Sequence, residues 1–465
     1  MTYESFVEEE TLHLLEHQLD QFLEPHRFNP EAQTIILIPG GMGSRLRRAR
    51  RPINPEHPVP PKSFSTIWAG CGLIFDKAAE KIRILPDGHD LDDRIIIADN
   101  VVKFFVHPYD RCIRFFRNEG WNVFVFGWDW RRKVTTSVDL LHHIMTEMSQ
   151  KVLDQYGVDI LPNTRVVGHS MGGMIAKIWM TDYPDMAAKT QGMISVGSPF
   201  YGYFGQMRRF YNGDYIFNDI YGAPTVAKVT SSMPGMYSLL PIDKATFDRD
   251  GAAIGLDTYP VMDPDGCTIA DPYSEAVLPR YPSWVRTEQI PRGKDVRVLL
   301  SQPVREDLTD RVYHLRGAEP DSTETSAVWQ TTLPPDYVPG TSPSPIQFGK
   351  TKGDGVIPLW SSRLASTPDA NIFDFPFGGH ALLMEKDAIL VRLYEILTGR
   401  RATVESLHKE LGPEPLVEDL EEALHFVRSS ASGEVSRATP HRSAKGLSGI
   451  VHPSVVRRLM VESGW

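Results

Sequence analysis

The segment GHSMGG at residues 168–173 places a serine between glycines two positions before and two positions after it. The apolar run TRVV precedes this segment and the helical pattern MIAKIWMTDY follows it. In a G-x-S-x-G nucleophile elbow, small residues at these positions let strand and helix approach closely, while the strained turn exposes the hydroxyl. Ser170 is therefore predicted to be a nucleophile. The alternative is a glycine-rich turn that binds a phosphate or no ligand.

A nucleophilic serine needs a base, and the base needs an acid that orients it. Behind an elbow of this type the chain order is Ser, then Asp or Glu, then His. His380 follows the run NIFDFPFGG, which predicts a base on a loop beyond the last strand. Asp354, between two glycines, is predicted to be the acid. Asp374, inside the strand-like run, and Asp310, after an earlier run, are the alternatives.

The oxyanion of an acyl-transfer intermediate needs two backbone N–H donors, one of them from the residue after the nucleophile. Met171 occupies that position. The second donor is predicted to be Gly41, in the segment PGGMG that follows the run TIILI, because glycines let the backbone turn its amides inward. A dinucleotide site is the alternative, but the G-x-G-x-x-G fingerprint is absent in proper register.

Strand-like and helical patterns alternate around these motifs. The strand-like runs are continuously apolar, which predicts strands buried on both faces of a parallel sheet. We therefore expect an α/β-hydrolase fold, with a mostly parallel central sheet, helices on both faces, and lid and cap insertions. The expected strands are Thr34–Pro39, Trp121–Phe126, Arg165–Val167, Met193–Val196, Val296–Leu300, Arg311–Leu315 and Asn371–Phe375. The expected helices are Val101–Glu119, Ser137–Gln155 with Ser137 as its N-cap, and a segment that begins near Met171.

The 465 residues allow two or three domains at ~100–200 residues each. However, the three predicted catalytic residues must meet, so most of the chain is expected to form one catalytic domain. The stretch 318–350, rich in Pro, Ser and Thr, is expected to be a long loop. The expected parts are 1–33, an N-terminal amphipathic helix packed on the body; 34–400, the catalytic domain with a lid insertion at about 47–100 and a cap insertion at about 201–290; and 401–465, a tail with one helix (Leu416, Leu420, Leu424, Val427) and a flexible linker.

Composition excludes several classes of protein. The AVILMFWYC share of 41% and the charged share of 23% are ordinary for a globular chain. A net charge of −10 disfavours a nucleic-acid binder, which needs a basic face. The three cysteines, Cys71, Cys112 and Cys267, indicate buried thiols in a reducing compartment. With no signal-peptide pattern at the start and no apolar run of ~18 residues, a cytoplasmic location is expected.

No cofactor or metal is predicted, since HExxH, Walker and clustered Cys/His patterns are absent; Asp263–Gly266 hints at a calcium loop but lacks the later ligands.

A basic cluster follows the oxyanion segment. Internal salt bridges or a solvated loop are the favoured interpretation, and attraction of an anionic substrate or lipid head group is the alternative. Its members are Arg45, Arg47, Arg48, Arg50 and Arg51.

Seven segments together resemble a known family: IPGGMGSRL (38–46), GWDWRR (127–132), GHSMGG (168–173), GSPFYG (197–202), SSMPGMYSLLP (231–241), GDGVIPL (353–359) and GGHALLM (378–384). Their order is similar to that of lecithin:cholesterol acyltransferase-like α/β-hydrolases, which include lysosomal phospholipase A2 and phospholipid:diacylglycerol acyltransferase relatives. The resemblance implies a catalytic triad of Ser170, Asp354 and His380, an oxyanion hole at Gly41 and Met171, and Trp128–Arg131 beside the site.

The chain departs from secreted members of that family. These carry a signal peptide and a disulfide-closed lid loop after the oxyanion segment, whereas residues 47–75 here contain only Cys71. The lid is therefore not expected to close in the same way.

The resulting hypothesis is a serine esterase or lipase that hydrolyses lipid-like or hydrophobic carboxylic esters through an acyl-enzyme. The first alternative is an acyltransferase that passes the acyl group to an alcohol. The second is a non-catalytic binding protein on a hydrolase fold. The expected partner is a small-molecule or lipid ester, with transient contact at a membrane surface and no nucleic acid; the oligomeric state stays open.

Overall fold

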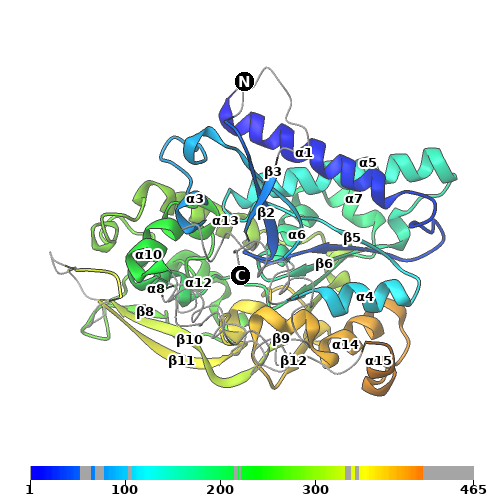
Figure 1. Cartoon of the computed structure of the whole chain (residues 1–465). Helices are drawn as coiled ribbons and strands as arrows, with labels where there is room; N and C mark the ends of the chain where they lie inside the picture. The colour runs from blue at the N-terminus through cyan, green and yellow to red at the C-terminus, as the bar shows by residue number, and fades with distance from the viewer. Residues whose placement is uncertain are drawn as a thin grey trace, which may run out of the picture.

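A parallel six-stranded sheet forms the centre of the molecule, in the order β12-β9-β7-β6-β1-β5 (Figure 1). The structure is a computed structural model that describes residues 2–52, 64–68, 78–102, 107–213, 218, 221–329, 333, 337–340 and 345–411. The strands of the central sheet are β1 (Thr34–Ile38), β5 (Asn122–Val125), β6 (Thr164–His169), β7 (Met193–Val196), β9 (Val312–Gly317) and β12 (Ile372–Phe375).

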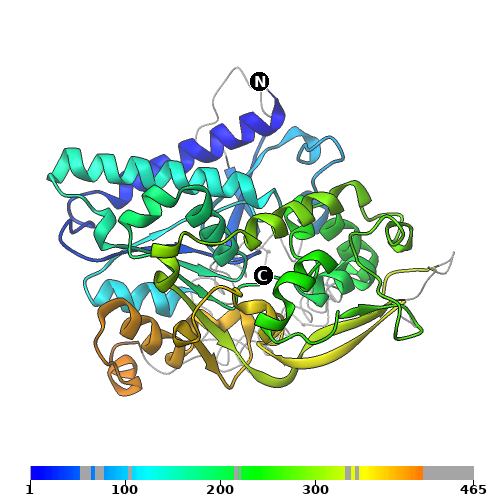
Figure 2. The same cartoon turned by 180° about the vertical axis from the view of Figure 1, so that it is seen from behind.

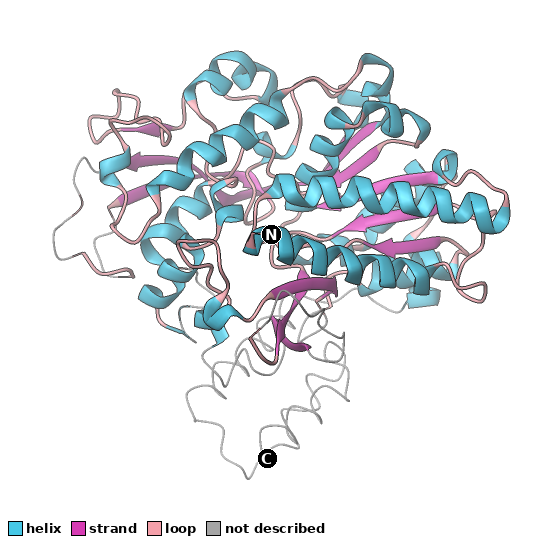
Figure 3. Ribbon diagram, turned by 90° about the horizontal axis from the view of Figure 1, so that it is seen from above, coloured by secondary structure: helices cyan, strands magenta, loops and turns pink. Residues whose placement is uncertain are grey.

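Helices cover both faces of this sheet, because its strands are apolar on both sides. In β1, Ile36 and Ile38 join one hydrophobic cluster, while Ile35 and Leu37 join another. Figure 3 shows α1 and α5 running side by side across one face. The helices of that face are α1 (Tyr3–Phe22), α5 (Val134–Tyr156), α6 (Met171–Asp182) and α7 (Pro184–Lys189), and those of the other are α4 (Asp110–Asn118), α14 (Asp387–Thr398) and α15 (Val404–Leu411).

The predicted α/β fold and most of its predicted strands are confirmed, but the strand expected at Val296–Leu300 is wrong. That segment is the end of helix α13 (Ile290–Ser301). Its buried residues recur at spacings of three and four, which is the period of a helix. These buried residues are Ile290, Gly293, Val296, Arg297 and Leu300.

Two helix boundaries also differ from the predictions. Helix α5 begins at Val134 with Lys133 as its N-cap, so Ser137 is a buried residue inside the helix. In the stretch expected to be helical from Val101, Val101 itself ends strand β4 (Ile96–Val101), and the helix that the structure describes, α4, begins at Asp110. Pro108 explains the late start, because the residue before a proline is disfavoured in helical conformation.

The segment after β1 contributes a second sheet, which packs beside α1. It is antiparallel, in the order β3-β2-β4. Helix α1 lies where the sequence predicts it, with Leu15 and Leu19 fully buried. The elements of this lid region are β2 (Ser44–Ala49), β3 (Phe64–Trp68), α3 (Ala78–Lys81) and β4 (Ile96–Val101).

The cap region combines the segment after β7 with a third sheet, β11-β10-β8, and is seen to one side in Figure 2. The prediction of a long loop at 318–350 is wrong, since β10 and β11 occupy much of it. Only Thr323, Ala327 and Trp329 of β10 are buried, so the polar strand carries little apolar signal. The elements are α8 (Phe204–Asn212), α10 (Ala223–Ser231), α11 (Pro234–Tyr237), α12 (Lys244–Ile254), β8 (Val261–Met262), β10 (Glu319–Trp329) and β11 (Ile346–Gly353).

The tail helix expected around Leu416–Val427 lies outside the described residues. Among the helices that the structure describes, none is long and apolar enough to cross a membrane.

Candidate active site

Ser170 lies on a strained turn between β6 and α6. Its backbone has φ 53° and ψ −126°, a conformation that is unusual for a residue with a side chain. The glycines on either side are required by close packing: a Cβ at Gly168 would lie 2.5 Å from the Gly172 carbonyl carbon, and one at Gly172 would lie 2.2 Å from the Ile38 oxygen. This geometry is that of a nucleophile elbow.

The structure brings the three residues of the predicted triad together. His380 Nε2 lies 3.0 Å from Ser170 Oγ, and His380 Nδ1 lies 2.6 Å from Asp354 Oδ2. Asp354 follows β11, and His380 begins the 3₁₀ helix η9 (His380–Glu385) after β12. Asp354 is 1% exposed and Ser170 is 8% exposed. A base is therefore within hydrogen-bond reach of the hydroxyl, and a carboxylate is within reach of the base.

The carboxyl group of Asp354 is fixed by its own loop. Its Oδ1 accepts the backbone N–H groups of Val356 at 3.0 Å and Ile357 at 2.7 Å, and its carbonyl oxygen accepts the N–H of His380 at 3.0 Å. The glycine at 197, with φ 58°, leaves space here, since a Cβ there would lie 2.8 Å from Asp354 Oδ2. Oδ2 is thus turned toward the imidazole.

The two alternative acids lie elsewhere. Asp374 is on β12 and pairs with Arg316 at 2.7 Å. Asp310 lies just before β9, at the amino end of the parallel sheet. Ser170 follows the carboxyl end of β6, so Asp310 is at the opposite edge of the sheet from the elbow.

The predicted oxyanion loop packs directly on the elbow. A Cβ at Gly41 would lie 2.6 Å from Met171 Sδ, and one at Gly40 would lie 2.8 Å from Ser170 Cβ. Trp128 holds this loop by donating its indole N–H to the Pro39 carbonyl at 2.8 Å. The segment that resembles the family's aromatic motif therefore does lie beside the elbow.

Two side chains beside the triad were not predicted from the sequence. His169 Nδ1 lies 2.8 Å from the Tyr109 hydroxyl, and His169 Nε2 lies 3.0 Å from the His380 carbonyl oxygen. The Tyr109 hydroxyl also accepts the N–H of Gly40 at 2.9 Å. Burial and the neighbouring His380 lower the pKa of His169 to about 3. The position of His169 inside GHSMGG was the signal available in the sequence.

An apolar pocket adjoins the oxyanion loop, where Met42 follows Gly41. Its empty space, including the open mouth, is about 470 Å³. It lies between the lid region and the cap region. Its walls are Met42, Trp68, Ala79, Ile82, Trp130, Arg209, Tyr221, Val226, Val229, Thr230, Met233 and Met236.

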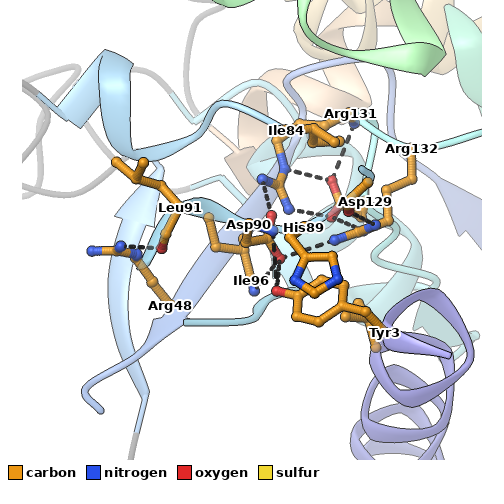
Figure 4. A network of polar contacts seen from close by, with 12 residues as sticks. Tyr3, Arg48, Ile84, His89, Asp90, Leu91, Ile96, Asp129, Arg131 and Arg132 are labelled. Atoms are coloured by element: carbon orange, nitrogen blue, oxygen red, sulfur yellow. Dashed lines mark hydrogen bonds and ion pairs between the residues drawn. The ribbon is translucent and has the colours of Figure 1, made fainter. Parts of the chain in front are cut away.

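A buried ionic cluster, drawn in Figure 4, borders this pocket at Ile82, whose carbonyl oxygen accepts from Arg131 at 3.1 Å. We name Asp90, Asp129, Arg131 and Arg132 the lid anchor. Arg131 is 0% exposed and donates to Asp90 Oδ1 at 2.8 Å and Asp129 Oδ2 at 2.6 Å. Arg132 donates to Asp90 Oδ2 at 2.9 Å. Burial alone would raise the pKa of Asp90, but the two arginines outweigh it and hold that pKa below its usual value.

The basic cluster after the oxyanion loop is largely paired internally, as the favoured interpretation predicts. Arg45 lies 2.6 Å from Asp99, and Arg47 lies 3.5 Å from the same carboxylate. Arg48 lies 3.0 Å from Asp92. The last two arginines of the cluster, at positions 50 and 51, are exposed.

Within the described part of the chain, no group of three or more His, Cys, Asp or Glu residues could hold a metal ion. In the 263–266 loop, Asp263 pairs with Arg280 and Asp265 accepts nearby N–H groups. Cys112 is a buried free thiol, but Cys267 is exposed, so the expectation of burial is wrong for Cys267. It lies in the stretch 264–269, whose residues are all exposed. Cys71 lies outside the described residues.

The strand order, the elbow after β6 and the histidine after β12 define an α/β-hydrolase fold. No family model matches the chain. It is 23% identical over 198 residues to lecithin-cholesterol acyltransferase-like 4 of Arabidopsis thaliana, covering 38% of this chain and 36% of that protein. The match thus spans about a third of the relative's length. A chain of the crystal structure of the Tle4–Tli4 complex has a TM-score of 0.49 and 15% identity, covering 79% of this chain and 98% of that chain.

Proposed function

We propose that this protein is a serine hydrolase that cleaves carboxylic esters with an apolar acyl part, as an esterase or lipase. The observation that carries the proposal is the hydrogen-bonded series Ser170–His380–Asp354 on a strained elbow. Oriented nucleophile, base and acid are the requirements of acyl-enzyme chemistry.

In the first half of the reaction, Ser170 Oγ attacks the ester carbonyl carbon while its proton passes to His380 Nε2. The carbonyl electron pair moves onto oxygen, where the N–H groups of Gly41 and Met171 would stabilise it. Asp354 stabilises the imidazolium that forms. The intermediate then expels the alcohol, which takes the proton from His380 and leaves the acyl group on Ser170.

In the second half, His380 removes a proton from water as the water attacks the acyl carbon. Collapse of this intermediate releases the carboxylic acid and returns the proton to Ser170 Oγ. The apolar pocket supports the choice of substrate, because it starts at Met42, one residue from the proposed oxyanion donor, and its walls suit an acyl chain.

Acyl transfer to an alcohol is the second candidate, favoured by the similarity to a protein named as acyltransferase-like. It uses the same acyl-enzyme, with an alcohol in place of water. Added long-chain alcohol separates the two: hydrolysis yields free acid throughout, whereas transfer yields mainly the new ester.

The decisive experiment combines p-nitrophenyl esters of increasing chain length, a phospholipid and a fluorophosphonate probe. We expect ester turnover, labelling of Ser170, and loss of about 10⁶ in kcat in Ser170→Ala, by analogy with other serine hydrolases. Ser301→Ala, which removes an exposed hydroxyl on α13, is the matched control and should keep full activity. Full esterase activity in Ser170→Ala would refute the mechanism, and an unlabelled Ser170 without turnover would favour a non-catalytic binding protein.

A further inference from the structure

A buried chain of hydrogen bonds joins the oxyanion loop to the proposed base. It runs from Gly40 N to the Tyr109 hydroxyl at 2.9 Å, then to His169 Nδ1 at 2.8 Å, and from His169 Nε2 to the His380 carbonyl oxygen at 3.0 Å. Tyr109 is 2% exposed and His169 is 3% exposed. Because solvent does not reach these groups, their hydrogen bonds depend on one another.

The hydrogen positions along this chain follow from the chemistry of its groups. The His380 carbonyl oxygen can only accept, so His169 Nε2 carries a hydrogen. Since burial keeps the imidazole of His169 neutral, its Nδ1 has no hydrogen and must accept one from Tyr109. Burial also raises the pKa of Tyr109, so the phenol keeps its proton and its oxygen accepts the N–H of Gly40. The donors therefore point in one direction along the whole chain.

The ends of the chain lie at the parts of the site whose positions matter for catalysis. Gly40 precedes Gly41, the proposed oxyanion donor, and packs so closely on the elbow that a Cβ there would lie 2.8 Å from Ser170 Cβ. A Cβ at Gly43 would lie 2.5 Å from the Tyr109 hydroxyl, so the absence of a side chain at Gly43 leaves room for this hydroxyl beside the loop. The other end holds the backbone of His380 itself.

We propose that Tyr109 and His169 are positioning residues, which fix the oxyanion loop and the base relative to Ser170 before substrate binds. This inference rests on the proposed ester hydrolysis. Both side chains are fully engaged within the protein, so they act through Gly40 and His380. Fixed geometry stabilises the transition state more than the bound ester, so its loss should lower kcat and leave KM nearly unchanged.

Tyr109→Phe tests the proposal, because it removes the shared hydroxyl and keeps the ring. With p-nitrophenyl butyrate we expect kcat to fall about tenfold or more, with KM within about twofold. Ser170 Oγ should attack the carbonyl carbon of a trifluoromethyl ketone of the same acyl length. The adduct carries an oxyanion that resembles that of the reaction intermediate. The Ki of this ketone should rise by the same factor as kcat/KM falls. Tyr259→Phe removes another buried hydroxyl, which donates to the Ile242 carbonyl, and should leave kcat and Ki unchanged.

A second pair of variants tests the other end of the chain and serves if Tyr109→Phe does not fold. In His169→Gln the side-chain amide can still donate to the His380 carbonyl, whereas in His169→Phe it cannot. We expect the glutamine variant to keep several times more kcat than the phenylalanine variant.

Three results would overturn the inference. Wild-type kcat and Ki in Tyr109→Phe would show that the chain does not position the site. Equal kcat in the two His169 variants, or a lower melting temperature without a change in kcat, would assign the groups to folding alone. A wild-type protein without ester turnover or Ser170 labelling would instead remove the proposed function on which the inference rests.

Discussion

The molecule contains two buried polar clusters that use opposite kinds of interaction. Beside the triad, Tyr109 and His169 are neutral and joined by single hydrogen bonds. In the lid anchor, Asp90 and Arg131 are fully buried ions, each with several charged or polar partners. Both clusters connect segments that are far apart in the sequence.

The difference follows from what each cluster is next to. A charged group beside His380 would shift the proton equilibrium of the base, whereas a neutral imidazole adds no net charge to the site. In the lid anchor, the arginines of the segment after β5 meet Asp90 of the lid region, so their charges can hold the lid segment in place. We therefore expect changes near the triad to alter rates and changes in the lid anchor to alter stability.

Asp354→Asn should produce the largest effect after loss of the nucleophile. The amide preserves the shape of the acid but cannot stabilise the imidazolium or fix its tautomer, so kcat should fall about 10⁴-fold. The melting temperature should change little. Asp374→Asn, at the alternative acid, is the control; a larger loss of kcat there would reverse the assignment of the acid.

The central sheet could be predicted because its strands are short apolar runs, each with a motif or a helix at its end. The elbow and His380 follow from such runs, so the candidate triad could also be placed. The segment Val296–Leu300 shows the limit of this reasoning. Its apolar run resembles a strand, and only its spacing from Ile290 and Gly293 indicates a helix.

The remaining parts depend on contacts between distant residues. Strand β10 is mostly polar, and Trp329 is fixed by Tyr211, 118 positions away. Tyr109 and His169 are 60 positions apart, and Asp90 and Arg131 are 41 positions apart. Such pairs leave no periodic signal, because either residue could equally be an ordinary core or surface residue.

Asp90→Asn tests the stabilising half of the comparison. Asp129 then remains as the one carboxylate for both Arg131 and Arg132, so one buried positive charge loses its counter-ion. Unfolding in urea should show a loss of about 3–5 kcal/mol. Because the folded pKa of Asp90 is below its unfolded value, its contribution is present above pH ~4 and lost as the pH falls further. Esterase activity per folded molecule should change less than in Asp354→Asn. A selective loss of kcat with normal stability would contradict the expectation that the lid anchor acts on stability and not on rate.

Glu385 extends the comparison to a buried acid on η9, the same helix that carries His380. Burial raises its pKa to about 8, although it accepts the N–H of Arg111. The native state then holds a proton that the unfolded state loses above pH ~4.5, so stability decreases as pH rises toward 8. For one such group, the free energy of unfolding should fall by about 2–3 kcal/mol between pH 5.5 and 7.5. Glu385→Gln should flatten this part of the stability profile measured in urea, and an unchanged slope would show that Glu385 is ionised in the native protein.

The smallest effect on stability is expected for Arg47→Gln. This substitution removes a partly exposed ion pair, in contrast to the buried pairs of the lid anchor. Arg47 is partly exposed, and its partner Asp99 keeps the closer Arg45, so no buried charge is left unpaired. The loss of stability should be below about 1 kcal/mol. KM should change equally for anionic and neutral esters of one chain length, because Arg47 is engaged within the lid sheet. A rise in KM confined to the anionic ester would instead assign the basic cluster to substrate recruitment and make charge a part of the active-site entrance.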